Sequence, residues 1–249
     1  MLFKQLFEPV SSTYTYLIGC GETGQAVLID PVLPTWQRDL AEIARLGLRL
    51  VYTLDTHIHA DHITAARKLK GEAGSRIAHP AIDALACTDL PLEEGTPLTV
   101  GGIRIDPIFT PGHTDGHHAY RIAGLVLTGD ALLIDACGRT DFQSGDAAAL
   151  YRSVTGKLFA LPDETLVYPA HDYEGRWVSS IAQEKTRNPR LGGGRPLAAF
   201  VELMGNLKLA YPKFIDYAVP GNRECGECPP GVPEHLQQYC EQIADSRQG

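Results

Sequence analysis

Hydrophobic and polar positions follow two different periods along the chain, and these periods predict both strands and helices. Short apolar or alternating runs predict strands at residues 14–18, 25–29, 48–54, 103–109, 118–122, 125–128 and 166–168. Segments with apolar residues at helical spacing predict helices at residues 36–46, 63–70, 147–159, 178–186 and 198–207. The mixture of strands and helices along the chain predicts an α/β protein.

Side chains that bind metals follow four of the predicted strands, at the point where each strand ends. They are His57, His113, Asp130 and His171. In open α/β sheets, ligands bind where the ends of strands meet the following loops. Four strand ends that carry metal-type ligands therefore predict a single shared site.

The first of these strand ends carries the richest cluster, His57-x-His59-x-Asp61-His62. Imidazole nitrogen and carboxylate oxygen suit zinc, iron and manganese. Alternate residues on a loop point the same way, so His57 and His59 are expected to face one position and Asp61 and His62 a neighbouring one. A lone histidine is more often structural, but a cluster combined with three further strand ends predicts a metal site.

Composition narrows the classes of partner. The chain has 249 residues, with 22 Lys and Arg against 30 Asp and Glu, which gives a net charge of −8. This acidic balance argues against nucleic acid as the main partner. No apolar run approaches the about 18 residues of a membrane span, and the first residues lack the pattern of a secretory signal. We therefore expect a cytoplasmic protein that does not bind membranes.

The composition shifts after Asn188-Pro189, and three glycines follow at 192–194. This shift predicts a catalytic domain over residues 1–190. Residues 191–249 are then expected to form a C-terminal helical extension and tail, packed on the same domain, with one helix near 198–207.

Six cysteines in a chain of this length do not indicate a disulfide scaffold. Only Cys225-x-x-Cys228 has the spacing of a metal ligand pair, and Cys240 with His235 would complete four ligands. A single such pair is a weak signal, so free thiols in the C-terminal tail are expected. Cys137 is expected to be a small buried residue.

The ligand pattern resembles the metallo-β-lactamase superfamily, because His57-x-His59-x-Asp61-His62 is followed by His113, Asp130 and His171 in that order. The resemblance implies an αββα sandwich with a metal site along one edge of its two sheets. Since this fold serves many reactions, it does not by itself establish the function.

The flanking segments are similar to those of the persulfide dioxygenases, the ETHE1-type sulfur dioxygenases. They are TGDALLI at 128–134, CGRTDFQ at 137–143, YPAHDY at 168–173, EKTRNPRL at 184–191 and IDYAVP at 215–220. This second resemblance covers nearly the whole chain. It implies oxidation of the terminal sulfur of glutathione persulfide with O2, giving sulfite and glutathione.

The resemblance also implies roles for individual residues. One ferrous ion per chain would be held by His57, His113 and Asp130. Residues that orient these ligands and nearby waters would be His59, Asp61, His62, His171 and Asp172. Substrate contacts would come from Arg139, whose guanidinium suits a glutathione carboxylate, and from Tyr173. The alternative for Arg139 is a structural ion pair with Asp141.

Three further expectations stay open at this level. A second metal at Asp61, His62, Asp130 and His171 would make the chain a glutathione thioester hydrolase of the glyoxalase II type. A non-catalytic sulfur carrier or redox sensor would instead use Cys225 and Cys228. The resemblance leaves room for a homodimer and for a pathway link to a sulfide:quinone oxidoreductase or a sulfurtransferase.

Overall fold

The chain forms two compact units in the computed structural model, which describes residues 1–241. Unit 1 comprises Met1–Pro91, Thr99–Ile103 and the chain from Tyr211 onward, and unit 2 comprises Leu92–Leu98 and Arg104–Ala210. Most of unit 2 is therefore one continuous segment, after which the chain returns to unit 1 at Tyr211. The predicted division after residue 190 follows a different boundary and stays a prediction about the extent of the catalytic domain.

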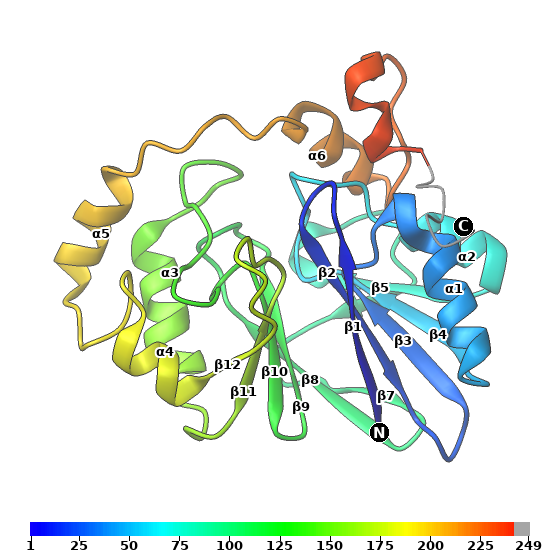
Figure 1. Cartoon of the computed structure of the whole chain (residues 1–249), viewed down its shortest axis with the longest axis horizontal. Helices are drawn as coiled ribbons and strands as arrows, with labels where there is room; N and C mark the ends of the chain where they lie inside the picture. The colour runs from blue at the N-terminus through cyan, green and yellow to red at the C-terminus, as the bar shows by residue number, and fades with distance from the viewer. Residues whose placement is uncertain (242–249) are drawn as a thin grey trace. The chain divides into compact units, whose positions relative to one another are not determined.

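Unit 1 is built on a mixed sheet with the strand order β1-β2-β3-β4-β5-β6. The strands are β1 (Leu2–Glu8), β2 (Thr13–Gly19), β3 (Gln25–Ile29), β4 (Arg49–Leu54), β5 (Arg76–Pro80) and β6 (Leu90–Leu92). β1, β2 and β3 pair in antiparallel fashion, whereas β3, β4 and β5 are parallel. Helices α1 (Trp36–Arg45) and α2 (Ala66–Ala73) lie on the same face of this sheet (Figure 1).

The apolar residues of these elements explain why they assemble. Leu17, Leu28 and Leu50 of the sheet pack against Ile43 of α1 and Leu69 of α2 in one buried cluster. Burying a leucine or isoleucine side chain contributes about 1.5–3 kcal/mol. The helices therefore cover one face of the sheet. Because β3 and β4 are parallel neighbours, their carboxyl ends lie side by side.

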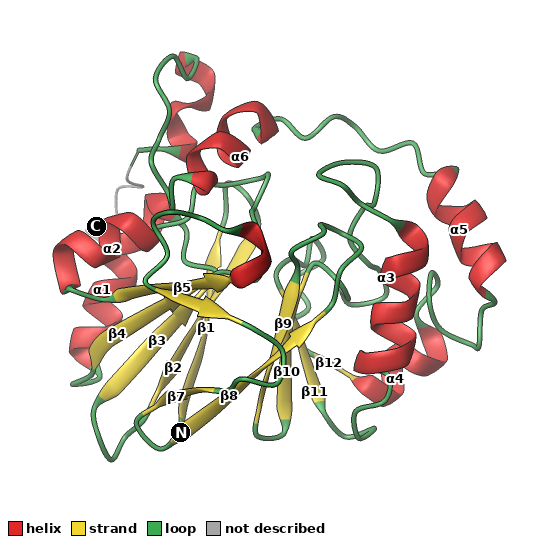
Figure 2. Cartoon of the chain, turned by 180° about the vertical axis from the view of Figure 1, so that it is seen from behind, coloured by secondary structure: helices red, strands yellow, loops and turns green. Residues whose placement is uncertain are grey.

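A second mixed sheet has the strand order β12-β11-β10-β9-β8-β7, and its strands β9 to β12 lie wholly in unit 2. Its strands are β7 (Leu98–Val100), β8 (Ile103–Phe109), β9 (His118–Ile122), β10 (Leu125–Gly129), β11 (Leu166–Pro169) and β12 (Ser179–Ser180). Only β10 and β11 are known to be parallel among its described pairs. The helices are α3 (Ala147–Ser153), α4 (Ile181–Arg187) and α5 (Leu197–Gly205), and α3 and α4 flank the β9–β12 side (Figure 2).

Several predicted helices differ from the observed ones in their ends. The helix expected from residue 63 begins at Ala66, and the one expected from 178 begins at Ile181, where the Ser180 side chain accepts a hydrogen bond from the backbone N–H of Gln183. Such N-caps satisfy donors that the first turn leaves unpaired. The helix expected over 147–159 ends as α-helix at Ser153 and continues as a π-helical turn over Val154–Leu158.

The prediction of one helix in the C-terminal segment was wrong, because α6 (Ile215–Arg223) follows α5. Pro220 lies inside α6, and proline normally argues against a helix interior, which is why the pattern did not predict this helix. Phe214 and Ala218 pack with Ile63 and with Leu236 and Tyr239 in a buried cluster of unit 1. This tertiary packing supports the short helix despite its proline.

The cysteines of the C-terminal segment are paired, so the prediction of free thiols there was wrong. Cys225 forms a disulfide with Cys87, and Cys228 forms one with Cys240. The sequence separations are 138 and 12 residues. The spacing within the Cys-x-x-Cys motif did not indicate that its cysteines pair with Cys87 and Cys240, which lie outside the motif. The thiols of this motif are therefore not available as zinc ligands in this structure.

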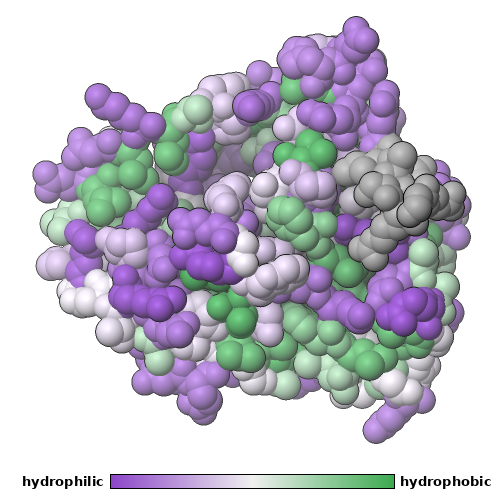
Figure 3. Space-filling view, in the orientation of Figure 1, coloured by the Kyte–Doolittle hydropathy of each residue, from purple (hydrophilic) through white to green (hydrophobic). Residues whose placement is uncertain are grey.

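The surface is largely hydrophilic in the view of Figure 3, with smaller apolar areas between the polar residues. Large hydrophobic residues that are exposed include Tyr173, Trp177 and Tyr211. Among the helices in residues 1–241, none has both the length and the apolar character needed to cross a membrane.

Candidate metal centre

The loop between β4 and α2 carries the predicted ligand cluster of unit 1. β4 ends at Leu54, and the imidazoles of His57, His59 and His62 follow, all nearly fully buried. The Asp61 side chain keeps 31 % of its surface exposed. Because the three imidazoles are buried, their nitrogens must find partners within the site.

Asp30 fixes the first half of this loop from the neighbouring strand β3. Its Oδ1 lies 3.0 Å from His59 Nε2 and accepts a hydrogen bond of 2.7 Å from the backbone N–H of Thr56. Thr56 Oγ1 donates to Asp30 Oδ2 and lies 2.9 Å from His57 Nδ1. A partner on one imidazole nitrogen fixes the ring and directs the other nitrogen, as is usual for histidines that bind metals.

The second half of the loop has the same arrangement. His62 Nδ1 lies 3.0 Å from Asp61 Oδ2 and 3.3 Å from Thr13 Oγ1. Among the described residues, neither His62 Nε2 nor His59 Nδ1 has a hydrogen-bond partner, although both are buried. One donor atom each of His59, Asp61 and His62 lies within 4.8 Å of the others. Buried nitrogens without partners are costly, so this donor set fits a bound metal ion.

Unit 2 brings together three of the residues predicted from strand ends. His113 Nε2 lies 3.4 Å from Asp130 Oδ2, and His171 Nε2 lies 3.6 Å from Asp130 Oδ1. The buried Asp130 Oδ1 accepts no hydrogen bond from the described part of the chain. His113 Nδ1 lies 2.7 Å from the backbone oxygen of Arg139. When Nδ1 of His113 donates its proton to this oxygen, Nε2 carries none and faces Asp130. An unprotonated Nε2 is what a metal ligand requires.

Strand ends explain why these three side chains converge. Asp130 directly follows β10, His171 follows the parallel neighbour β11, and His113 follows β8. The backbone N–H of Asp130 donates to His117 Nε2 at 3.1 Å, and Thr110 Oγ1 lies 2.8 Å from His117 Nδ1. These two contacts link the backbone at Asp130 through the His117 ring to Thr110.

Two groups near the ligands have shifted pKa values. Burial lowers the pKa of His59, but the charge and hydrogen bond of Asp30, together with the charges of Asp61 and Asp55, outweigh it and raise this pKa to about 9. Burial raises the pKa of the Cys137 thiol to about 11. Cys137 is 2 % exposed, which confirms the predicted small buried residue, and its thiol is of low reactivity.

The residues predicted to bind substrate occupy different environments. Arg139 donates two hydrogen bonds of 2.7 Å to the Asp141 carboxylate and one of 2.8 Å to the backbone oxygen of Ala210. The structural ion pair is therefore present. Tyr173 is 75 % exposed and stacks on the ring of His171 at a centroid distance of 5.9 Å. Asp172 is buried and accepts hydrogen bonds from Arg176.

Sequence reasoning missed four residues that support the loop of unit 1. Asp30 and Asp55 directly follow β3 and β4, so the strand-end argument applied to the other ligands would have found them. His79 lies 3.8 Å from Asp55 Oδ2 and 2.8 Å from Asp83 Oδ2. Asn222 lies in α6, where no sequence signal connects it to the loop.

Comparisons with known proteins show which family the chain belongs to. Residues 9–171 match the model of the metallo-β-lactamase superfamily. The human "Persulfide dioxygenase ETHE1, mitochondrial" is 47 % identical over 230 residues, which covers 91 % of this chain and 89 % of that protein. The crystal structure of ETHE1 from Myxococcus xanthus superimposes with a TM-score of 0.89 at 50 % identity, covering 91 % of this chain and 100 % of the other.

A hydrolase is also similar, but over a smaller part of the chain. The hydroxyacylglutathione hydrolase of Cereibacter sphaeroides is 36 % identical over 186 residues, which covers 73 % of this chain and 71 % of that protein. The predicted metallo-β-lactamase fold and the predicted family are both confirmed. This chain belongs to the metallo-β-lactamase superfamily and, within it, to the ETHE1-type persulfide dioxygenases.

Proposed function

We propose that this enzyme is an Fe(II)-dependent dioxygenase that oxidises the terminal sulfur of glutathione persulfide with O2. The products are sulfite and glutathione. The observation that carries this proposal is the 47 % identity to a human persulfide dioxygenase over 89 % of that protein's length. The donor atoms found in each unit are chemically suited to it.

The proposed centre holds one ferrous ion per chain, bound by His57, His113 and Asp130. Two imidazoles and one carboxylate are the donor set typical of non-haem Fe(II) oxygenases, because they leave positions for dioxygen and substrate. When bound, the ferrous ion supplies the one-electron chemistry that makes O2 reactive. The contact of His113 Nδ1 with the Arg139 carbonyl supports the ligand role of this histidine.

The reaction consumes one water for each O2. The S–S bond of the persulfide breaks, and the outer sulfur gains both atoms of O2 and one oxygen of water to become sulfite. The inner sulfur leaves as the glutathione thiol, and two further protons are released. No side chain is needed as a nucleophile, so the role of the protein is to hold the reactants together.

Arg139 is proposed to bind a carboxylate of the glutathione moiety. Its guanidinium already pairs with the Asp141 carboxylate, so the substrate carboxylate must replace Asp141 or share the guanidinium with it. The side chain of Arg139 is 18 % exposed, whereas that of Asp141 is 54 % exposed. The more exposed partner is the one that can move away. The exposed ring of Tyr173 is proposed to contact the same substrate.

The remaining polar residues are proposed to orient ligands and waters, namely His59, Asp61, His62, His171 and Asp172. The unpartnered nitrogens of His59 and His62 beside Asp61 also favour a second candidate, a two-metal thioester hydrolase of the glyoxalase II type. The homodimer, the cytoplasmic location and the pathway link stay predictions.

Oxygen uptake tests the proposal. Protein loaded anaerobically with one Fe(II) per chain is mixed with glutathione persulfide, and O2 and sulfite are followed together. We expect equal amounts of O2 consumed and sulfite formed, and loss of both in His113→Ala. His235→Ala removes an exposed histidine of the C-terminal segment and should keep the activity. Arg139→Met should raise KM more than it lowers kcat.

Two results would decide against the dioxygenase. One is an absence of O2 uptake by protein that is shown to contain iron. The other is hydrolysis of a glutathione thioester that depends on two bound metal ions, on Asp61 and on His62. The second result would establish the hydrolase in place of the dioxygenase.

A further inference from the structure

The side-chain amide of Asn222 holds the metal-binding loop of unit 1 from a helix that lies far away in the sequence. Its Nδ2 donates hydrogen bonds of 2.9 Å to the backbone oxygen of His59 and 2.8 Å to that of His62. Its Oδ1 accepts a hydrogen bond of 2.9 Å from the backbone N–H of Thr64. Asn222 is 3 % exposed, so water does not compete for these three bonds.

These three bonds hold the backbone at His59, His62 and Thr64, in the same loop as the proposed ligand His57. Residues 55–65 contain no regular helix or strand that would pair their carbonyls and amides. One amide therefore replaces the hydrogen bonds that a regular element would supply. Because the backbone oxygens of His59 and His62 are fixed, their imidazoles leave the chain in fixed directions.

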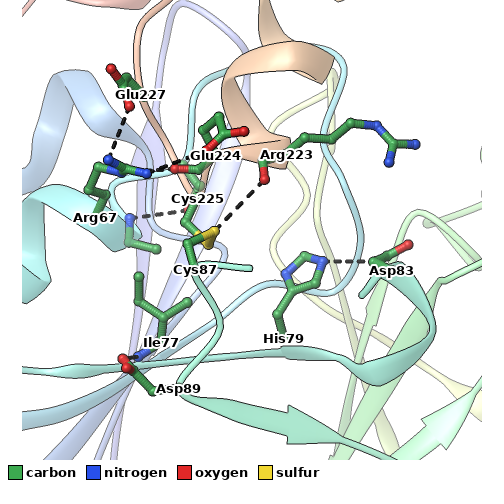
Figure 4. The surroundings of a disulfide bond; sticks show 12 residues. Arg67, Ile77, His79, Asp83, Cys87, Asp89, Arg223, Glu224, Cys225 and Glu227 are labelled. Carbon is green, nitrogen blue, oxygen red and sulfur yellow. Dashed lines mark hydrogen bonds and ion pairs between the residues drawn. A yellow bond between two sulfur atoms is a disulfide. The ribbon is translucent and has the colours of Figure 1, made fainter. Parts of the chain in front are cut away.

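The end of α6 is itself fastened to unit 1. Cys225 is joined to Cys87 by a disulfide, and the backbone oxygen of Cys225 accepts a hydrogen bond of 2.9 Å from the N–H of Arg67 (Figure 4). Arg67 Nε also donates to the backbone oxygen of Glu224 at 2.9 Å. Asn222 therefore lies three residues before a covalent attachment point.

The backbone of this segment approaches the loop closely. A Cβ atom on Gly226, whose φ is +98°, would overlap the backbone oxygen of Thr64, and one on Gly221 would lie 2.8 Å from the Ile63 side chain. Glycine permits both the backbone conformation and the approach. Residues 221–226 are thus packed directly against residues 63–64.

We propose that Asn222 is a positioning residue for the metal-binding loop and that the Cys87–Cys225 disulfide keeps it in place. The inference rests on the proposed metal binding by this loop, but not on the sulfur chemistry. It assigns a role to the Cys-x-x-Cys motif, whose first cysteine anchors the helix that carries Asn222.

Metal binding tests the role of Asn222 without any turnover. Metal-free protein is titrated with Co(II), and the affinity and the visible absorption spectrum are recorded. Loss of residues that orient metal ligands typically lowers metal affinity about 10–100-fold. We expect Asn222→Ala to lower Co(II) affinity within this range and to change the spectrum. In this variant the backbone N–H of Thr64 should exchange with solvent about ten times faster, which is the effect of losing one protecting hydrogen bond.

Asn188→Ala is the matched control. Asn188 is also 3 % exposed, and its amide donates to the backbone oxygen of Ala136 and accepts from the backbone N–H groups of Arg190 and Leu191. This variant should lose stability but keep the Co(II) affinity and spectrum. Asn222→Asp retains the acceptor for Thr64 and loses the two donors. It should keep the Thr64 amide protected while Co(II) affinity falls, and it replaces Asn222→Ala if that variant does not fold.

The role of the Cys87–Cys225 disulfide is tested with double variants, in which both cysteines of one disulfide are replaced by alanine. Cys87→Ala with Cys225→Ala should lower Co(II) affinity and speed exchange of the Thr64 amide. Cys228→Ala with Cys240→Ala removes the other disulfide of the same segment and should leave both unchanged.

Unchanged Co(II) affinity and spectrum in folded Asn222 variants would overturn the role of Asn222, and equal effects of the two cysteine pairs would overturn the role of the disulfide. A wild-type protein that binds no Co(II) would instead refute the proposed metal centre and this inference with it. A protein that binds Co(II) normally but consumes no O2 after iron loading would refute only the proposed activity.

Discussion

Gly138 leaves no room for a side chain beside two of the proposed metal ligands. Its backbone N–H donates a hydrogen bond of 2.7 Å to the backbone oxygen of Asp130. A Cβ atom at this position would lie 2.5 Å from that oxygen and 2.8 Å from His113 Nδ1. The small residue is therefore required where the Asp130 and Arg139 segments pass each other.

We expect Gly138→Ala to weaken metal binding, because the added methyl group must displace either the His113 ring or the backbone at Asp130. A displacement of this kind should lower metal affinity by about tenfold, as losses in the groups around metal ligands do. Titration of metal-free protein with Co(II) measures it. Gly124→Ala is the matched control, since a Cβ there meets no atom within 4 Å. Equal affinities of the two variants would contradict the argument.

The candidate ligands could be predicted because each one marks the end of a strand. His113, Asp130 and His171 follow apolar runs in the sequence, and their convergence follows from sheet topology. The hydrogen bonds of Asn222 could not be predicted, because they join atoms 158 to 163 residues apart. The pairing of Arg139 with Asp141 was foreseen as an alternative, since two opposite charges two residues apart readily meet.

At the scale of elements, helix α1 buries an ionisable group that takes no part in the site. Asp39 of α1 is completely buried, and its Oδ1 lies 2.8 Å from Arg38 Nη2. Burial raises the pKa of Asp39 from 3.8 to about 6, against the opposing attraction of Arg38. The carboxyl group of Asp39 therefore binds its proton more tightly in the folded protein than in the unfolded chain.

Stability is expected to fall as the pH rises through the pKa of Asp39. Its contribution is fully present below pH 3.8 and is lost by about pH 6, a change of about 3 kcal/mol in the free energy of unfolding at 1.36 kcal/mol per pKa unit. Asp39→Asn should accordingly be more stable than the wild type at pH 8, with the advantage shrinking towards pH 4.

Urea unfolding of both proteins between pH 4 and pH 8 measures this difference. Comparison with the wild type cancels the contributions of the other carboxylates. A difference in unfolding free energy that does not vary with pH would show that Asp39 titrates normally.

Elements with a strong pattern of apolar positions in the sequence were predicted, whereas elements that depend on tertiary packing were not. The strands β3, β4, β8, β9 and β10 have clear apolar patterns and appear where the sequence places them. Most residues of β1 are only partly buried, and Glu8 alone among them is fully buried, so the strand carried no recognisable pattern of apolar positions. α6 contradicts the usual meaning of an interior proline, and only its contacts with Phe214 and Ile63 in the folded unit explain it.

At the scale of the whole molecule, the disulfide between Cys87 and Cys225 joins the places where the chain leaves unit 1 and returns to it. All of unit 2 lies between these two cysteines in the sequence. In Figure 1 the orange and red C-terminal segment accordingly lies with the blue and cyan elements of unit 1. A cross-link that closes a long loop removes more conformational freedom from the unfolded chain than one that closes a short loop.

The two disulfides should therefore contribute unequally to stability. Chain-entropy arguments give about 5 kcal/mol for a loop of 138 residues and about 3 kcal/mol for one of 12 residues. Replacing Cys87 and Cys225 by alanine should lower the free energy of unfolding more than replacing Cys228 and Cys240. Denaturant unfolding of the metal-free variants measures both losses. The opposite ranking would show that native contacts, and not loop closure, dominate.

The return of the chain to unit 1 has a consequence for the order of events on the ribosome. Every residue of unit 2 has been synthesised once Ala210 is added, whereas unit 1 still lacks Phe214, Ala218 and Asn222. Domains fold as units while synthesis proceeds, so the part of the protein begun first is the part completed last. The loop with His57, His59 and His62 emerges early but receives its hydrogen bonds from Asn222 only after all of unit 2 has been synthesised.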